Sequence, residues 1–227
     1  MSVFSRTPDI FQGISDADLE KMLVCFQAQF RHSFVGETLL TYANHFEKMG
    51  VMITGEADLV RFDQDGNRTL IEHLMPGDVF GEMFAVAFRP DKEELALIAS
   101  KDCEYLFIDY SHLIKRCPNA CSYHSILVSN TLQLMTQKAR DLNARIETLS
   151  RRTLRQKLMT YFEIQASQLG SAKFRLPFSL EKLADYLCVD RSAMLREMKK
   201  LRDEGFIVSK GRAIELLGLH LPSRNTH

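Results

Sequence analysis

A heptad pattern in the middle of the sequence limits most strongly what this chain can fold into. Apolar residues recur there at alternating spacings of four and three positions, and Cys121 and Ser125 extend the series backwards in the same register. The members are Val128, Leu132, Met135, Ala139, Leu142, Ile146 and Leu149. A stripe this narrow is typical of a long helix that pairs with another helix, rather than one that packs on a broad core.

The predicted helix spans about residues 118–149, because Pro118 can occupy its first turn without losing a hydrogen bond. The chain contains no second heptad run of this length, so we expect the partner to be the same helix of a second copy. A helix that lies against its own domain is the alternative, because intramolecular helices use similar spacings. The pattern therefore predicts a dimerisation helix and a homodimer.

Two short amphipathic helices separated by a tight turn are predicted between residues 179 and 201. Ser179 can cap the first helix and Asp190 the second, because each side-chain oxygen can accept an orphan backbone N–H. The inward face is apolar and consists of Leu180, Leu183, Ala184, Leu187, Met194, Met198 and Leu201. The outward face of the second helix carries Arg191, Ser192, Leu195, Arg196 and Lys199. This composition suits the major groove of DNA, where arginine binds guanine, serine bonds several bases and leucine contacts the thymine methyl.

A β-hairpin is predicted after the second helix, over residues 205–216, with its turn at Lys210 and Gly211. Such a hairpin would be the wing of a winged helix-turn-helix, with Lys210 and Arg212 close to DNA phosphates. A plain helical hairpin with a solvated charged face is the alternative. The caps, the two faces and the wing agree with one another, and together they favour DNA binding.

Charge is unevenly distributed along a chain whose formal net charge is zero. Residues 151–227 carry 15 Lys and Arg against 8 Asp and Glu, whereas residues 1–150 carry 14 against 21. A basic C-terminal part is consistent with a polyanionic partner, although two solvated surfaces can also differ in this way by chance. The asymmetry supports DNA binding without deciding it.

Residues 30–110 are predicted to form short β-strands joined by tight turns, after a first segment of about 25 residues with helical character. Asp65-Gly66-Asn67, between 57–62 and 69–74, is a hairpin signal, because Gly and Asn tolerate positive φ. Met75-Pro76-Gly77-Asp78 is a second turn. Glycines recur throughout, at 36, 50, 55, 66, 77 and 81. Turns at this density favour an all-β barrel or sandwich.

Over about residues 10–217, the chain resembles the Crp/Fnr family, which includes the cyclic AMP receptor protein and the oxygen sensor FNR. Two strings carry the resemblance: Pro76-Gly-Asp-Val-Phe-Gly81-Glu82-Met83 and Leu183-Ala-Asp-Tyr-Leu-Cys-Val-Asp-Arg-Ser-Ala. The resemblance implies an α+β fold that begins with a cyclic-nucleotide-binding-like β-roll, a jelly roll or double-stranded β-helix, in residues 1–117. A dimerisation helix at 118–149 and a winged helix-turn-helix at 150–227 would follow.

The resemblance also implies a function and a set of DNA contacts. The family consists of dimeric regulators of transcription that bind palindromic double-stranded DNA and work with RNA polymerase. Arg191, Ser192 and Arg196 fall at its base-reading positions, but many members have Glu where Ser192 stands, so the preferred half-site stays open. The expected DNA contacts are Ser179, Arg191, Ser192, Leu195, Arg196, Lys199, Lys210 and Arg212.

The effector is a separate question. In members that bind cyclic nucleotides, Gly-Glu-Leu is followed further along the chain by Arg-Ser, which binds the cyclic phosphate. Gly81-Glu82-Met83 resembles the first part, but Glu93 and Glu94 stand where Arg-Ser is expected. Two carboxylates repel a phosphate, and arginine supplies the paired donors that phosphate favours. We expect these five residues to lie at the effector site and the effector to be a small-molecule or redox signal other than cyclic AMP.

No metal site is predicted, and the cofactor is unknown. A [4Fe–4S] cluster of the FNR type is not expected, because only Cys25 precedes Cys103 and such clusters need several cysteine ligands. Cys117, Cys121 and His124 fall at i, i+4 and i+7 and share one helix face, which is compatible with metal or haem chemistry. Three residues do not close a site without a fourth ligand, and two structural cysteines with a surface histidine are the alternative.

Other classes of function have no support in the sequence. No nucleophile–base pair, P-loop or His-Glu-x-x-His motif is present, so an enzyme is not expected. No apolar run is long enough to cross a bilayer, and the first residues lack the order of a signal peptide, so we expect a cytoplasmic protein without membrane contact. The remaining alternative is a ligand-binding regulatory module that acts on a protein partner instead of DNA.

Overall fold

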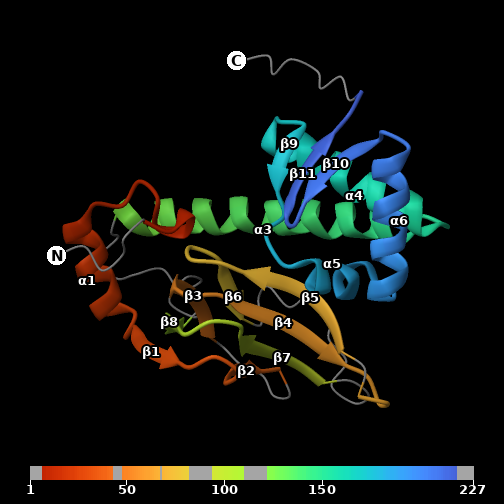
Figure 1. The fold of residues 1–227 in the computed structure, drawn as a ribbon. Helices are drawn as coiled ribbons and strands as arrows, with labels where there is room; N and C mark the ends of the chain where they lie inside the picture. Colours follow the sequence, from red (N-terminus) through yellow and green to blue (C-terminus); the bar gives the residue numbers. More distant parts are fainter. Residues whose placement is uncertain (1–6, 43–47, 67, 82–93, 110–121, 219–227) are drawn as a thin grey trace. The chain divides into compact units, whose positions relative to one another are not determined.

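The fold is described from a computed structural model, for residues 7–42, 48–66, 68–81, 94–109 and 122–218. The chain divides into two compact units, residues 1–138 and 139–227, and each is described by itself. Figure 1 shows that strands dominate the first unit and that the second combines helices with a small sheet. In the described residues, no helix is both long and apolar enough to cross a membrane.

The first unit begins with a short 3₁₀ turn, η1 (Asp9–Phe11), and the helix α1 (Asp16–Cys25). Ser15 caps α1, because its hydroxyl accepts a hydrogen bond from the backbone N–H of Asp18 at 3.2 Å. The helical character expected of this segment is therefore confirmed for residues 16–25. Five apolar residues of these two elements are buried in one cluster: Ile10, Phe11, Leu19, Met22 and Leu23.

Two four-stranded antiparallel sheets form the β-roll, and the predicted fold class is confirmed. The first sheet has the order β1 (Gln29–Ser33), β8 (Cys103–Asp109), β3 (Lys48–Thr54) and β6 (Val79–Gly81). The second has the order β2 (Thr38–Thr41), β7 (Glu94–Ala99), β4 (Ala57–Phe62) and β5 (Arg68–Leu74). Since strands far apart in sequence lie side by side, this pairing could not be read from local turn signals.

Three aromatic rings occupy the core of the roll. Phe80, Tyr105 and Phe107 meet edge to face, with ring centroids 5.4 to 6.0 Å apart. Gly50 lies against the first of them, and a Cβ atom at this position would lie 2.2 Å from the Phe80 ring. Glycine at position 50 therefore makes room for the aromatic core.

Both predicted turns of this region are present. The β4–β5 hairpin closes through Asp63, whose carbonyl oxygen accepts from Gly66 N–H at 3.0 Å; Asn67 lies outside the described residues. In the second turn the Asp78 backbone N–H donates to the carbonyl of Met75 at 3.0 Å, and the Asp78 carboxylate accepts from Met75 N–H at 2.7 Å. Burial raises the pKa of the Asp78 carboxyl.

The helix α3 (Ser122–Leu149) packs against the first unit through a stripe that the heptad does not contain. Leu127 and Thr131 are buried, and Leu134 is half-buried against the same core. Asn130 fixes this face, since its side-chain amide donates to the carbonyl oxygens of Ile10 and Gln12 at 3.0 and 2.8 Å. The alternative of a helix lying on its own domain is therefore right for this stripe.

The heptad stripe of α3 is exposed in a single copy of the chain. Its exposed members are Val128, Leu132, Met135, Ala139, Leu142 and Ile146, whereas Leu149 is half-buried. Leu132 and Ile146 expose 61% and 63% of their surface, which is unfavourable for leucine and isoleucine in water. A single helix thus presents one stripe to its own domain and another to solvent.

The second unit holds α4 (Leu154–Leu169), α5 (Leu180–Leu187) and α6 (Arg191–Asp203), with a three-stranded sheet in the order β10-β11-β9. Its strands are β9 (Lys173–Arg175), β10 (Ile207–Lys210) and β11 (Ala213–Leu216). Thr153 and Gln156 form a reciprocal capping box at the start of α4, and Gly170 ends that helix with φ +65°. Helices α5 and α6 and the β10–β11 hairpin match the prediction, whereas β9 was not predicted.

Candidate nucleic-acid interface

The helix-turn-helix of the second unit consists of α5 and α6, and both start at their predicted caps. The Ser179 hydroxyl accepts from Lys182 N–H at 3.2 Å, and the Asp190 carboxylate accepts from Ala193 N–H at 2.8 Å. Cys188 ends α5 in the left-handed conformation, with φ +54°. The turn is closed by the Val189 N–H, which donates to the Ala184 carbonyl at 3.1 Å. These bonds fix the direction in which α6 leaves the turn.

Helix α6 has two distinct faces. Met194, Met198 and Leu201 are buried in the unit. The opposite side is exposed to solvent and carries the predicted groove-facing residues Arg191, Ser192, Leu195, Arg196 and Lys199. A helix with a buried apolar face and an exposed face rich in cations and hydrogen-bond donors matches what major-groove recognition requires.

A chain of polar contacts joins the cap of α6 to its exposed face. The Ser192 hydroxyl donates to the Asp190 carboxylate at 2.6 Å, and the Arg196 guanidinium donates to the Ser192 hydroxyl at 3.3 Å. The hydrogen bond from Ser192, with the bond from the Ala193 backbone, holds the pKa of Asp190 below its usual value. The Arg196 side chain is thus oriented by one long hydrogen bond and keeps donors for a ligand.

Arg155 links α4 to α6, a contact that was not predicted from the sequence. Its guanidinium donates to Glu197 at 2.8 Å and to both carboxylate oxygens of Glu204 at 2.6 and 2.7 Å. Glu197 lies within α6, and Glu204 is the residue that ends it. The seven-residue spacing of the two glutamates places them on one helix face, which is the only local signal that could have revealed the contact.

The end of α3 is attached to α5 within the second unit. The buried Arg145 guanidinium lies 4.5 Å from the Tyr186 ring centroid and donates to the Tyr186 carbonyl oxygen at 3.4 Å. Tyr186 in turn packs against Tyr161 and Phe178, with centroids 5.5 and 5.7 Å apart. Residues 139–149 of the long helix and the helix-turn-helix therefore share one packed core.

The wing is the predicted hairpin of β10 and β11, but its turn consists of Gly211 and Arg212, one residue later than expected, because Lys210 still pairs with Ala213. Lys210 is exposed at its tip, whereas Arg212 is half-buried and donates to the Pro177 carbonyl oxygen at 3.4 Å. In Figure 1 the wing turn and the start of α6 lie at the same end of this unit, near α5. The predicted DNA-contacting residues near the caps and the wing tip are thus brought together at one end.

Most of the predicted effector site lies outside the described residues, including Glu82, Met83 and Glu93. Glu94 begins β7, where its backbone pairs with Phe62. Gly81 ends β6 with φ +125°, and a Cβ atom there would lie 2.5 Å from the Lys48 carbonyl oxygen, so the backbone requires glycine. The Gly81 N–H donates to the Tyr42 hydroxyl at 3.2 Å, and burial raises the pKa of that hydroxyl.

The cysteine–histidine trio is described only in part. Cys117 and Cys121 lie outside the described residues, and His124 is half-buried on α3. Among the residues that the structure describes, no group of three His, Cys, Asp or Glu side chains is arranged to hold a metal ion. The trio stays a sequence-based hypothesis.

Comparison with known families agrees with this geometry. A model described as a cyclic nucleotide-binding domain matches residues 32–118, and one described as a Crp-like helix-turn-helix domain matches residues 154–220. The chain belongs to the Crp/Fnr family of transcription regulators. As a member of this family it is a DNA-binding regulator of transcription, as the helix-turn-helix predicted.

Relatives of this Crp/Fnr regulator match it over most of their length. It is 24% identical over 213 residues to the transcriptional activator protein FnrL of Cereibacter sphaeroides, covering 86% of this chain and 79% of that protein. It is 23% identical over 192 residues to the cAMP-activated global transcriptional regulator CRP of Pasteurella multocida, covering 82% and 90%. The structure of FixK2 from Bradyrhizobium japonicum has the same fold, with a TM-score of 0.58, 22% identity and coverage of 84% and 93%.

Proposed function

We propose that this Crp/Fnr regulator acts as a homodimer that binds a palindromic DNA operator with the α6 helix of each copy in the major groove. The observation that carries the proposal is the composition of α6, whose exposed face holds Arg191, Ser192, Leu195, Arg196 and Lys199 opposite three buried apolar residues. The hydrogen bonds at the Ser179 and Asp190 caps fix where both helices begin, and all five residues of this face are exposed to solvent.

The exposed residues of α6 divide into two roles by position and chemistry. Arg191, Ser192 and Arg196 lie in the first two turns, and we assign them to base edges, with the arginines donating to guanine O6 and N7. Leu195, between them, would contact a thymine methyl group. Lys199, one turn later, would bind a phosphate, as would Lys210 and Arg212 of the wing and Ser179 at the start of α5.

We propose that the exposed heptad of α3 is the dimer interface. Burying five large apolar side chains against the same stripe of a second copy removes them from water, which is the main driving force for such pairing. The proposed division of the chain is a sensory β-roll at 1–117, a dimerisation helix at 118–149 and a DNA-binding domain at 150–227. Two symmetric half-sites in the operator follow from the two-fold symmetry.

The β-roll would sense a small-molecule or redox signal other than cyclic AMP, at a site around Gly81, Glu82, Met83, Glu93 and Glu94. The two glutamates at 93 and 94 oppose the binding of a cyclic phosphate. We propose further that the protein has no enzymatic activity, works in the cytoplasm and controls transcription through contact with RNA polymerase.

The test uses full-length protein and two labelled duplexes, one enriched from a random pool and one unrelated. Fluorescence anisotropy over a series of salt concentrations should show tighter binding to the enriched duplex, with an affinity that falls as salt rises. Equal and weak binding of both duplexes by a folded dimer would contradict the proposal. That outcome would favour a ligand-binding module that acts on a protein partner.

A further inference from the structure

The exposed face of the winged sheet carries an ordered row of residues. Lys210 of β10 pairs with Ala213 of β11, which pairs with Arg175 of β9. Directly paired residues project from the same side of a sheet, so these three form one row across it. All three are exposed, whereas the neighbouring residues that point to the other side, Phe174 and Ile214, are buried.

The cations on this face differ in whether a carboxylate neutralises them. Lys173, two residues before Arg175 on the same face, forms an ion pair with Glu215 of β11 at 3.0 Å. In the described part of the chain, the side chains of Arg175 and Lys210 have no hydrogen bond and no ion pair. Ala213 lies between them and is too small to cover either side chain. The row therefore carries two positive charges that no carboxylate neutralises among the described residues.

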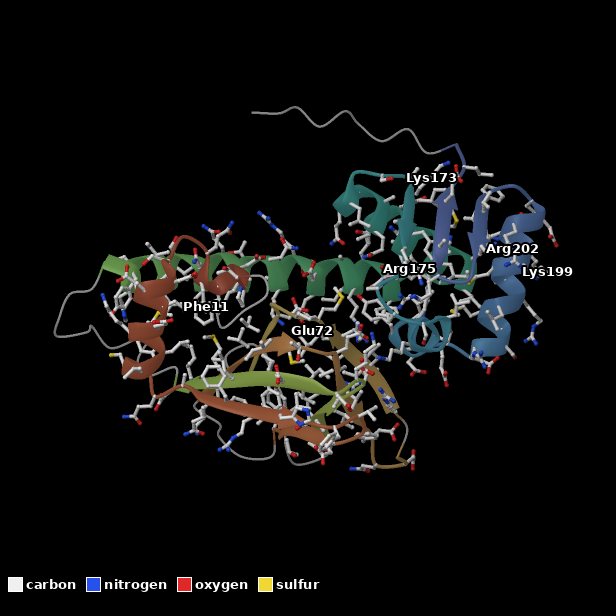
Figure 2. The ribbon with its side chains drawn as sticks, turned by 60° about the vertical axis from the view of Figure 1, so that its left-hand side comes forward. Phe11, Glu72, Lys173, Arg175, Lys199 and Arg202 are labelled. Carbon is white, nitrogen blue, oxygen red and sulfur yellow. The ribbon has the colours of Figure 1, made fainter. Side chains whose placement is uncertain are left out.

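Arg175 is fixed to the wing by the residues that follow it. The Leu176 backbone N–H donates to the Arg212 carbonyl oxygen at 2.8 Å, and the Arg212 guanidinium returns a bond to the Pro177 carbonyl oxygen at 3.4 Å. Figure 2 shows Arg175 toward the α5 end of β9 and Lys173 toward the opposite end. Arg175 thus lies on the side of the unit where α5 begins and the wing turns.

We propose that Arg175 binds a phosphate of the DNA backbone and that, with Lys210 across Ala213, it forms a clamp on the duplex beside the half-site. The inference rests on the proposed function and adds a contact outside the helix-turn-helix. Two strand spacings, about 10 Å, separate the backbones of the two residues, so they can bind separate phosphates. An arginine in such a position neutralises a phosphate with paired donors and releases a counterion.

The test measures the affinity of the full-length protein for its enriched duplex and for an unrelated duplex at several salt concentrations. Arg175→Ala should weaken both by the same factor and reduce the slope of log K against log salt by about 0.9, the value for one phosphate contact. Lys173→Ala is the matched control, because it removes a cation from the same strand and face that Glu215 already neutralises. Its slope should equal that of the wild type, and Arg175→Lys should keep most of the slope.

Three results would overturn the inference or its basis. The first is an unchanged salt slope for Arg175→Ala in a variant that unfolds at the same midpoint as the wild type by circular dichroism. That result would show that the row does not contact DNA, and it would favour an acidic protein as the partner of the row. Equal losses for Arg175→Ala and Lys173→Ala would show that the effect is not specific to the uncompensated row. Absence of DNA binding by the wild type would instead contradict the proposed function itself, which separates the two failures.

Discussion

The Arg155 guanidinium donates two parallel hydrogen bonds to the Glu204 carboxylate, from Nη1 at 2.6 Å and from Nη2 at 2.7 Å. Its Nε donates to Glu197 at 2.8 Å, so one side chain of α4 contacts both the middle and the end of α6. These bonds hold the pKa values of both glutamates below their ordinary range. Arg155 is therefore a positioning residue for the helix that we assign to the major groove.

Replacing Arg155 with alanine should lower the stability of the second unit. The change leaves Glu197, whose side chain is only 17% exposed, without its guanidinium partner. The chain has no tryptophan, so the unfolding midpoint is best followed by circular dichroism. Arg152→Ala is the control, because Arg152 is an exposed arginine near the same helix start with no ion pair in the described residues. Equal midpoints for the two variants would show that the contact does not stabilise the fold.

The same contact predicts how stability depends on pH. A carboxyl with a lowered pKa binds fewer protons in the folded state than in the unfolded state, so its contribution is complete above the ordinary glutamate pKa of about 4.3. That contribution is lost as pH falls through the lowered values of Glu197 and Glu204. The stability difference between wild type and Arg155→Ala should thus shrink between pH 6 and pH 3, measured by urea denaturation at each pH, with about 0.15 M salt throughout. A difference that grows on acidification would contradict the assignment.

The heptad of α3 predicts which residues hold the dimer together. Leu132 and Leu142 are exposed in one copy and should be buried between two, so lysine at both positions would place charges in an apolar seam. The double variant should sediment as a monomer of about half the wild-type mass while the β-roll keeps its fold. Gln133→Lys with Asn143→Lys is the control, since both positions are exposed and lie outside the heptad. A dimer that survives the leucine changes would place the interface elsewhere.

Cyclic AMP should not be the effector. Its phosphate would meet Glu93 and Glu94, and each carboxylate would have to be protonated or displaced before the ligand entered. Isothermal calorimetry should show no binding in the micromolar range, and the nucleotide should leave operator affinity unchanged. The Glu93→Arg, Glu94→Ser double variant should bind the anion better, though weakly. Micromolar binding by the wild type, coupled to tighter DNA binding, would contradict this prediction. It would show that a cationic side chain offsets the repulsion between the phosphate and the two carboxylates.

Local chemistry explains which parts of the fold were predictable. The caps Ser179 and Asp190 determine where α5 and α6 begin, and Gly211 locates the wing turn to within one residue, because each signal acts within a few residues. The heptad likewise predicted the long helix and its end at Leu149. Such features depend on spacing along the chain, which the sequence contains directly.

The features that were missed depend on contacts between distant residues. Strand β9 has only three residues and pairs with β11, about 40 positions later, so no turn signal announces it. The buried stripe of α3 includes the polar Thr131, whose hydroxyl is satisfied by the Leu127 carbonyl, and therefore does not read as an apolar pattern. The bond from Arg155 to Glu204 joins residues 49 positions apart. The effector residues between 82 and 93 stay predictions.

The most direct measurement of the central claim is selection of DNA sites from a random duplex library by the full-length wild type, Arg196→Ala and Lys210→Ala. The account predicts that the wild type enriches a palindrome with half-sites one helical turn apart. Arg196→Ala should lose about 1–3 kcal/mol of specific binding and relax one base position in each half-site. Lys210→Ala should keep the same consensus and weaken all sequences equally, with a salt slope lower by about one unit. An unchanged consensus for Arg196→Ala, with a loss like that of Lys210→Ala, would contradict the placement of α6 in the major groove.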